Sequence, residues 1–112
     1  MDRVKRGDLV VVALPGDYGK PRPALIVQSD LFNETHASVT VVPVTSTLVD
    51  APLFRLTVEP SPVNGLRSFS QLMIDKVTTV SRTRIAQSIG RLEDDLVLRV
   101  SRALALWMGI AT

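Results

Sequence analysis

Residues 53–59 read Leu53-Phe54-Arg55-Leu56-Thr57-Val58-Glu59, with apolar and polar side chains alternating from Phe54 onward. Phe54, Leu56 and Val58 fall on one face of an extended chain, and the polar residues between them fall on the other. A period of two predicts a strand with one buried face, so the fold is expected to contain a sheet with a covered side.

Similar segments lie on both sides of this stretch, each bounded by turn-forming residues. Residues 8–14 are rich in β-branched side chains and stop at Pro15-Gly16-Asp17. Residues 60–65 contain two prolines and an Asn-Gly pair, which predict a break in the sheet. Further strands are expected at residues 24–28 and 38–42, near 71–74 and near 77–80.

The apolar period changes near the C-terminus. Apolar side chains recur there at steps of three and four, at Leu92, Leu96, Val100, Ala103, Leu104 and Trp107, which predicts one apolar face of a helix that stops near Gly109. Short strands followed by one helix predict a mainly β fold with α, an α+β class. We expect a small, strongly bent antiparallel sheet or open barrel as a single domain over residues 1–112.

The composition excludes several classes of protein. The 112 residues include no cysteine, so a disulfide framework, a thiolate nucleophile and a thiolate metal site are all excluded. No apolar run approaches the roughly 20 residues of a membrane-spanning helix, and the N-terminus lacks an apolar signal core, so a cytoplasmic protein without membrane contact is expected. The formal charge is +2, with Arg concentrated in the second half, which permits a basic face for a polyanion.

The usual catalytic side chains are scarce. His36 is the only histidine and lies in a polar stretch typical of a loop, where an exposed, non-catalytic role is the ordinary interpretation. No metal site can be built around it, and no phosphate-binding glycine loop is present. An enzyme with this sequence would therefore rely on Arg, Lys, Thr, Ser or carboxylates, with no cofactor.

Two local features could carry such chemistry. Arg22 lies between Pro21 and Pro23, which exclude it from a helix and predict a stiff loop entering a strand, where its planar guanidinium would suit a phosphate. Thr45 belongs to a hydroxyl cluster where residues 38–42 run out. Each also has an ordinary interpretation, as an exposed arginine in a proline turn and as hydroxyls that satisfy nearby backbone groups.

These features occur in an ordered set that resembles the PemK/MazF toxins over most of the chain. The set comprises Arg6-Gly7-Asp8, Arg22 to Asp30, Asn33, Pro43-Val44-Thr45-Ser46, Gly65-Leu66, Ser70, Thr79-Val80, Arg82, Arg84-Ile85 and Gly90. The resemblance implies an SH3-like barrel toxin of the CcdB/PemK-like fold. It also implies a homodimer that cleaves single-stranded RNA at short sequences without metal and that is neutralised by an antitoxin partner.

The resemblance also assigns roles to residues. The family's catalytic Arg and Thr fall on Arg22 and Thr45, which would bind the scissile phosphate while the RNA 2′-hydroxyl attacks, leaving a 2′,3′-cyclic phosphate and a 5′-hydroxyl. Ser70 and Asp75 match positions that line the RNA groove. The expected RNA-binding residues are Lys20, Ser46, Ser70, Asp75, Lys76 and Arg82.

The chain departs from the family pattern at two positions. Lys76 stands where the family often has Gln, and Ser81 where it often has Asp. Lys76 adds a positive charge beside the expected groove, so the RNA sequence preferred by relatives is not carried over to this chain.

Two other functions stay open at this stage. Leu106-Trp107-Met108-Gly109-Ile110 is similar to the end of the CcdB toxins, which share the fold and poison DNA gyrase without cutting RNA. Trp107 also falls on the apolar face of the predicted helix, where a role in the core or in a dimer is the simpler account. A noncatalytic SH3-like nucleic-acid binder is the third possibility. Only the RNase needs both Arg22 and Thr45.

Overall fold

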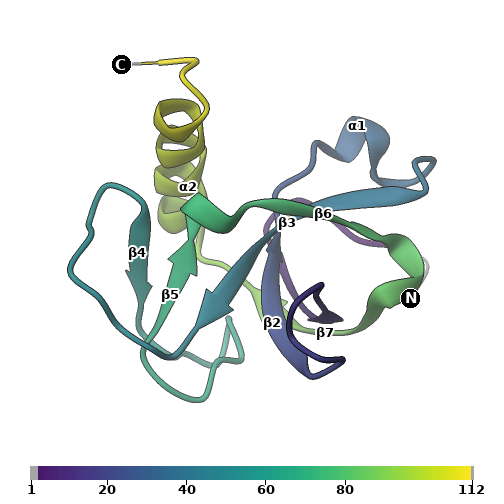
Figure 1. The fold of residues 1–112 in the computed structure, drawn as a ribbon, viewed down its shortest axis with the longest axis horizontal. Helices are drawn as coiled ribbons and strands as arrows, with labels where there is room; N and C mark the ends of the chain where they lie inside the picture. The colour runs from purple at the N-terminus through teal and green to yellow at the C-terminus, as the bar shows by residue number, and fades with distance from the viewer. Residues whose placement is uncertain (1–2, 112) are drawn as a thin grey trace.

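The computed structural model describes residues 3–111 and shows a bent antiparallel sheet with one long helix packed against it (Figure 1). Hydrogen-bonded strands follow the order β4-β5-β3-β2-β1-β7, and β6 pairs with β3 beside this path. The strands are β1 Asp8–Ala13, β2 Pro21–Ile26, β3 Ser38–Thr45, β4 Arg55–Val58, β5 Ser70–Met73, β6 Thr78–Ser81 and β7 Ile85–Arg91. The helical segments are α1 Asp30–Asn33, η1 Ile74–Lys76, η2 Arg82–Arg84 and α2 Asp94–Trp107.

The predicted fold class is confirmed, with an open rather than a closed barrel. The path of paired strands within residues 3–111 ends at β4 on one side and at β7 on the other, and these two strands do not pair with each other. Each neighbouring pair of strands in the sheet runs antiparallel.

Strand β3 joins the two halves of the sheet. Its first half pairs with β6 from Ser38 to Val41, whereas its end pairs with β5 at Val44 and Thr45. The η1 turn carries the chain from β5 to β6, so the two strands pair with successive parts of β3 (Figure 1). The end of β3 is therefore the place where the sheet changes direction.

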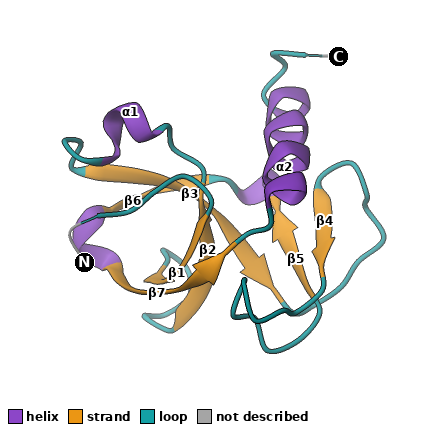
Figure 2. Cartoon of the chain, turned by 180° about the vertical axis from the view of Figure 1, so that it is seen from behind, coloured by secondary structure: helices purple, strands orange, loops and turns teal. Residues whose placement is uncertain are grey.

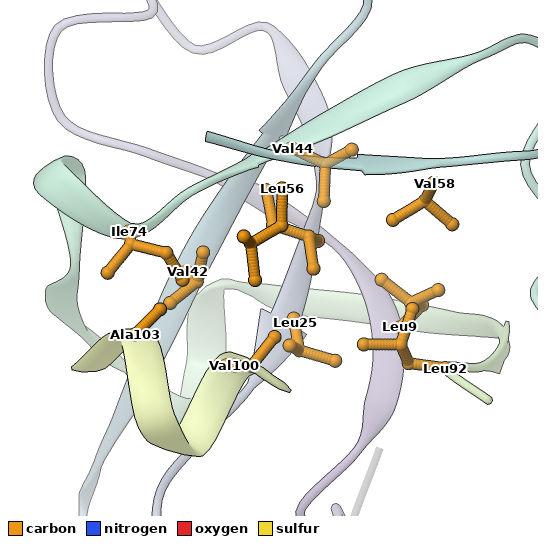
Figure 3. Packing of buried hydrophobic residues seen from close by; sticks show 11 residues of the cluster. Leu9, Leu25, Val42, Val44, Leu56, Val58, Ile74, Leu92, Val100 and Ala103 are labelled. Carbon is orange, nitrogen blue, oxygen red and sulfur yellow. The ribbon is translucent and has the colours of Figure 1, made fainter. Parts of the chain in front are cut away.

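Both faces of the sheet are buried, which explains the long apolar runs in β1 and β3. One cluster contains Leu9, Leu25 and Val42 and packs against Val100 and Ala103 of α2 (Figure 3). Successive residues of the same strands fill a second cluster, which comprises Val4, Val10, Val12, Leu14, Ala24, Ile26, Val39, Val41, Val80 and Ile85. The two clusters therefore pack against opposite faces of the sheet.

The terminal helix ends as predicted, but it begins at Asp94, so Leu92, which was assigned to its apolar face, lies before it. Glu93 is the residue before its first turn, and Met108 and Gly109 follow its last residue, with Gly109 at a φ of 75°. Figures 1 and 2 both show α2 beside β4 and β5, with α1 at the far end of β3. None of the helices within residues 3–111 is long and apolar enough to span a membrane.

The alternation that predicted a strand at residues 53–59 is confirmed over a shorter range. Leu56 and Val58 are buried, whereas Thr57 and Glu59 are exposed. The hydrogen-bonded strand starts only at Arg55, because the backbone N–H groups of Phe54 and Arg55 donate to Ala51 O and close a turn.

Two local features differ from the prediction. Arg22 lies inside β2 and not on a loop before it, because β2 begins at Pro21 and pairs with β1 from there. The strand β7 was missed, because its exposed middle residues follow no apolar period. The stretch around His36 is a loop, as predicted, and it follows the short helix α1, in which buried Asn33 donates hydrogen bonds to Gln28 O and Asp30 Oδ1.

Glu93 ties the turn at residues 60–65 to the start of α2. Its carboxylate accepts hydrogen bonds from Ser61 Oγ at 2.7 Å and from buried Asn64 Nδ2 at 3.3 Å. These hydrogen bonds hold the pKa of Glu93 below its usual value of 4.5, and the bond from Ser61 has the largest effect. The ionised carboxylate is therefore the form that stabilises the fold.

Replacing Glu93 with Gln is expected to lower the free energy of unfolding by about 1–2 kcal/mol at neutral pH, because a charged acceptor is lost. The folded-state pKa lies below the unfolded value, so the wild-type advantage is present above pH 4.5 and disappears as the pH falls through the folded pKa. Urea unfolding at neutral pH and at about pH 3 measures this difference. Glu34→Gln, at an exposed site, is the matched control, and an equal deficit at both pH values would contradict the assignment.

Candidate active site

Arg22 is fixed in place by its strand and by a carboxylate. Its Nε lies 2.8 Å from Asp17 Oδ2, and its Nη2 donates to Asp17 Oδ1 at 3.2 Å. The side chain remains 34% exposed, so solvent and ligands can reach the guanidinium. Asp17 lies on the turn between β1 and β2, and one edge of the guanidinium is held while another part stays accessible.

Thr45 is the last residue of β3. Its Oγ1 accepts a hydrogen bond from the N–H of Thr47 at 3.1 Å, as the ordinary interpretation of this hydroxyl cluster predicted. A threonine hydroxyl is also a donor, and its proton is still free to bind an anion.

The strand register brings Arg22 and Thr45 together. Strands β2 and β3 pair as Ala24↔Pro43, Leu25↔Val42 and Ile26↔Val41. Continuing this antiparallel register by two residues sets Arg22 opposite Thr45, just beyond the last paired position. The two residues predicted to be catalytic therefore face each other where β2 and β3 separate.

Two hollows meet at this pair, and both are lined by Arg22 and Thr45. The first has a volume of about 570 Å³, and the second about 750 Å³. Both volumes are in the range of small-molecule binding sites, and together they form a groove with Arg22 and Thr45 between its two halves.

The first hollow is rich in charge. Besides Arg22 and Asp17, it is lined by Arg55 and Lys76. Arg55 is held by Asp75 through two hydrogen bonds, Nε to Oδ1 at 2.7 Å and Nη2 to Oδ2 at 3.0 Å. The bond from Arg55 keeps the pKa of Asp75 below its usual value of 3.8, and the same bond raises the pKa of Arg55.

The second hollow is mostly uncharged. Hydroxyl and amide groups line it at Ser46, Thr47, Ser68, Ser70 and Gln87, beside the apolar residues Val11, Leu66 and Ile89, and Arg67 is its one cation apart from Arg22. Ser70 is buried, and its hydroxyl donates to Ser68 O at 2.9 Å, which leaves the oxygen able to accept. This surface can contact the edge and the face of an unpaired base.

The structure brings some of the predicted site residues together and leaves others apart. Arg22, Thr45, Ser46, Ser70 and Lys76 all line the groove. Asp75 does not line the groove, and its carboxylate is engaged by Arg55, which does.

Lys20 and Arg82 do not line either hollow. Lys20 is exposed on the β1–β2 turn. Arg82 donates to His36 O and Asn33 O, and so ties η2 to the end of α1. Those bonds give Arg82 a structural role, and His36 itself is exposed. Among residues 3–111, no three His, Asp or Glu side chains are grouped as a metal ion would require.

Sequence reasoning missed Arg55 and Asp17. Arg55 was visible only as a polar residue of the alternating strand, and its partner Asp75 is 20 residues away. Asp17 was interpreted as a turn residue alone. A carboxylate five residues before the central arginine is the only signal that could have indicated this pair.

Comparisons with known proteins agree with this geometry. The model of the family described as PemK-like, MazF-like toxin of type II toxin-antitoxin system matches residues 5–108. A Mycolicibacterium smegmatis protein named probable endoribonuclease MazF is 51% identical over 109 residues, 96% of this chain and 99% of the relative. Endoribonuclease EndoA of Bacillus subtilis is 24% identical over 111 residues, covering 96% of each chain.

A solved structure shows the same fold. It is described as an endoribonuclease in complex with its cognate antitoxin from Mycobacterial species, and it superposes with a TM-score of 0.79 at 22% identity. The match covers 97% of this chain and 98% of the other.

Proposed function

The chain belongs to the PemK-like, MazF-like toxins of type II toxin-antitoxin systems, and on this premise we propose that it cuts single-stranded RNA without a metal ion, by attack of the RNA's own 2′-hydroxyl. It is an enzyme of the endoribonuclease class, as its relatives at 51% and 24% identity are named. The proposal adds which bond of the RNA is cut and which residues take part in the reaction.

The observation that carries the proposal is that Arg22 and Thr45 both line the two hollows, just beyond the paired ends of β2 and β3. A nucleophile on the protein is not needed when the 2′-hydroxyl of the substrate attacks. The 2′-oxygen forms a bond to phosphorus, the bond from phosphorus to the 5′-oxygen breaks, the 2′-hydroxyl gives up its proton to a base, and the leaving 5′-oxygen takes up a proton. The products are a 2′,3′-cyclic phosphate and a 5′-hydroxyl.

Arg22 and Thr45 would stabilise the charge that grows on the phosphate during this step. The guanidinium is held on one edge by Asp17, so its accessible N–H groups are already oriented before RNA binds. The Thr45 hydroxyl donates to the same phosphate from the opposite strand. Donors fixed in advance cost no reorganisation in the transition state, and each is commonly worth about 10²–10³ in rate.

The toxin is further proposed to act as a cytoplasmic homodimer that an antitoxin neutralises. Exposed apolar side chains at the end of α2 and directly after it, among them Leu106, Trp107 and Ile110, are typical of a surface that binds another chain. An antitoxin segment rich in acidic and apolar residues would suit the cations of the groove.

Incubation of the purified protein with single-stranded RNA in EDTA tests the proposed activity. Wild type is expected to cut and to leave cyclic-phosphate ends, whereas Arg22→Ala and Thr45→Ala should leave the RNA intact. Arg84→Ala removes an exposed arginine outside both hollows and should cut like wild type. Intact RNA with blocked DNA gyrase supercoiling in a parallel assay would overturn the proposal in favour of a gyrase poison.

A further inference from the structure

Arg55 is a second guanidinium in the groove, and the proposed cleavage step does not use it. It is the first residue of β4 and lies opposite Met73 of β5, and it lines the first hollow together with Arg22 and Lys76. Its partner Asp75 lies on η1, directly after β5. Both residues are thus attached to paired or tightly turned backbone.

The Arg55–Asp75 pair is rigid and largely buried. The side chains are 14% and 17% exposed, and the two hydrogen bonds join one edge of the guanidinium to both carboxylate oxygens. Bidentate pairing of this kind fixes the plane of the guanidinium as well as its position. Each carboxylate oxygen of Asp75 already accepts a hydrogen bond from Arg55, and the side chain is only 17% exposed, so a base has restricted access to it.

The other edge of Arg55 is free. Nη1 forms no hydrogen bond to any of residues 3–111, and it is not among the buried atoms that lack a partner. An accessible nitrogen with two N–H groups, on a residue that lines a hollow, is a ready donor to a ligand in that hollow.

We propose that Arg55, held by Asp75, binds an RNA phosphate next to the scissile one, and that Asp75 is a positioning residue rather than a reader of bases. This inference rests on the proposed RNA cleavage. The charges select the phosphate: Arg22, Arg55 and Lys76 line the first hollow, and its one acidic residue, Asp17, is already paired with Arg22. The second hollow, with its hydroxyl and apolar lining, takes a base.

Binding of 2′-O-methyl RNA, which cannot be cleaved, tests the phosphate contact over a series of salt concentrations. Arg55→Met leaves Asp75 as an unpaired, mostly buried carboxylate, so the double variant Arg55→Met/Asp75→Met is the main probe. The double variant has the net charge of wild type, and a change in its binding reflects the lost contact. Thermal unfolding confirms that it is folded.

The double variant is expected to bind 2′-O-methyl RNA about tenfold more weakly than wild type, because it loses one hydrogen bond to a charged group. The slope of log affinity against log salt should become shallower by about 0.7, the value for one phosphate on a single strand. Arg99→Met, on the exposed side of α2, is the matched control for loss of a cation and should leave the slope unchanged. A wild-type slope in the folded double variant would overturn the proposal.

Asp75→Asn separates positioning from base reading. A positioning residue should raise the KM for all RNA sequences alike and leave kcat and the cleavage sites unchanged, whereas a reader of bases should change which sequences are cut. A shift of cleavage sites would overturn the assignment of Asp75. Cleavage by wild type that is lost in Arg22→Ala tests the proposed function without involving Arg55 or Asp75. A failure of the cleavage proposal can therefore be distinguished from a failure of the Arg55–Asp75 proposal.

Discussion

Arg22→Lys is expected to slow RNA cleavage by about 10²–10³-fold at saturating RNA, while RNA binding falls by no more than about tenfold. Lysine keeps the positive charge but lacks the planar fork that can bind Asp17 on one edge and a phosphate on another. The contact is strongest when charge builds up on the phosphate, so kcat should fall further than the affinity. Single-turnover cleavage and binding to 2′-O-methyl RNA measure the two effects.

Thr45→Val belongs to the same experiment, because valine keeps the shape of threonine and removes only the hydroxyl. Its cleavage rate should fall about as far as that of Arg22→Lys. Thr47→Val, two residues beyond, removes a hydroxyl that also borders the second hollow and should keep most of the activity. Wild-type kcat in either Arg22→Lys or Thr45→Val would remove that residue from the proposed mechanism.

Gly90→Ala is expected to lower the free energy of unfolding by about 3 kcal/mol or more. A methyl group at this position of β7 would lie only 2.6 Å from Asn64 C, and it would also meet the Val63 carbonyl, whose oxygen accepts a hydrogen bond from Arg91 N. These neighbours are backbone atoms of the turn at residues 60–65 and cannot rotate away. For a domain of this size, such a loss lowers the Tm by about 12 °C or more.

Gly16→Ala is the control for this prediction. Gly16 has a φ of 89°, and a methyl group on its Cα would have no neighbour within 4 Å, so alanine there costs backbone strain of about 1–2 kcal/mol and creates no clash. Thermal unfolding of both variants distinguishes the two causes. Equal losses in the two proteins would mean that the close approach of β7 to the turn does not limit stability.

The sheet was predictable wherever one periodic pattern determined the structure. Leu56 and Val58 alternate with polar residues because one face of β4 is buried, and the apolar steps of α2 reflect its single buried face. Strand β7 gave no such signal, since its pairing with β1 is interrupted by register shifts and its middle residues are exposed. Gly90 of β7 is required because the turn at residues 60–65 lies against it, and this contact cannot be inferred from the local sequence.

The candidate site was predictable only in part. Arg22 and Thr45 were selected by resemblance to a family, and their position opposite each other is a property of strand register that a single sequence does not display. Arg55 and Asp75 are far apart in sequence, and each alone is an ordinary polar residue. Arg82 matched the family pattern, yet its bonds to carbonyl groups became visible only in the folded chain.

The prolines at the opening between β2 and β3 also affect how the protein behaves at high concentration. Backbone left unpaired at the end of a strand is a template on which another chain can extend the sheet, and this is a common start of aggregation. Pro21 and Pro23 lack a backbone N–H, yet both still pair with β1. The missing N–H groups are therefore those that would point away from β1, toward the open edge of β2. The opening that is proposed to admit RNA is thus poorly suited to recruit a strand from a neighbouring molecule.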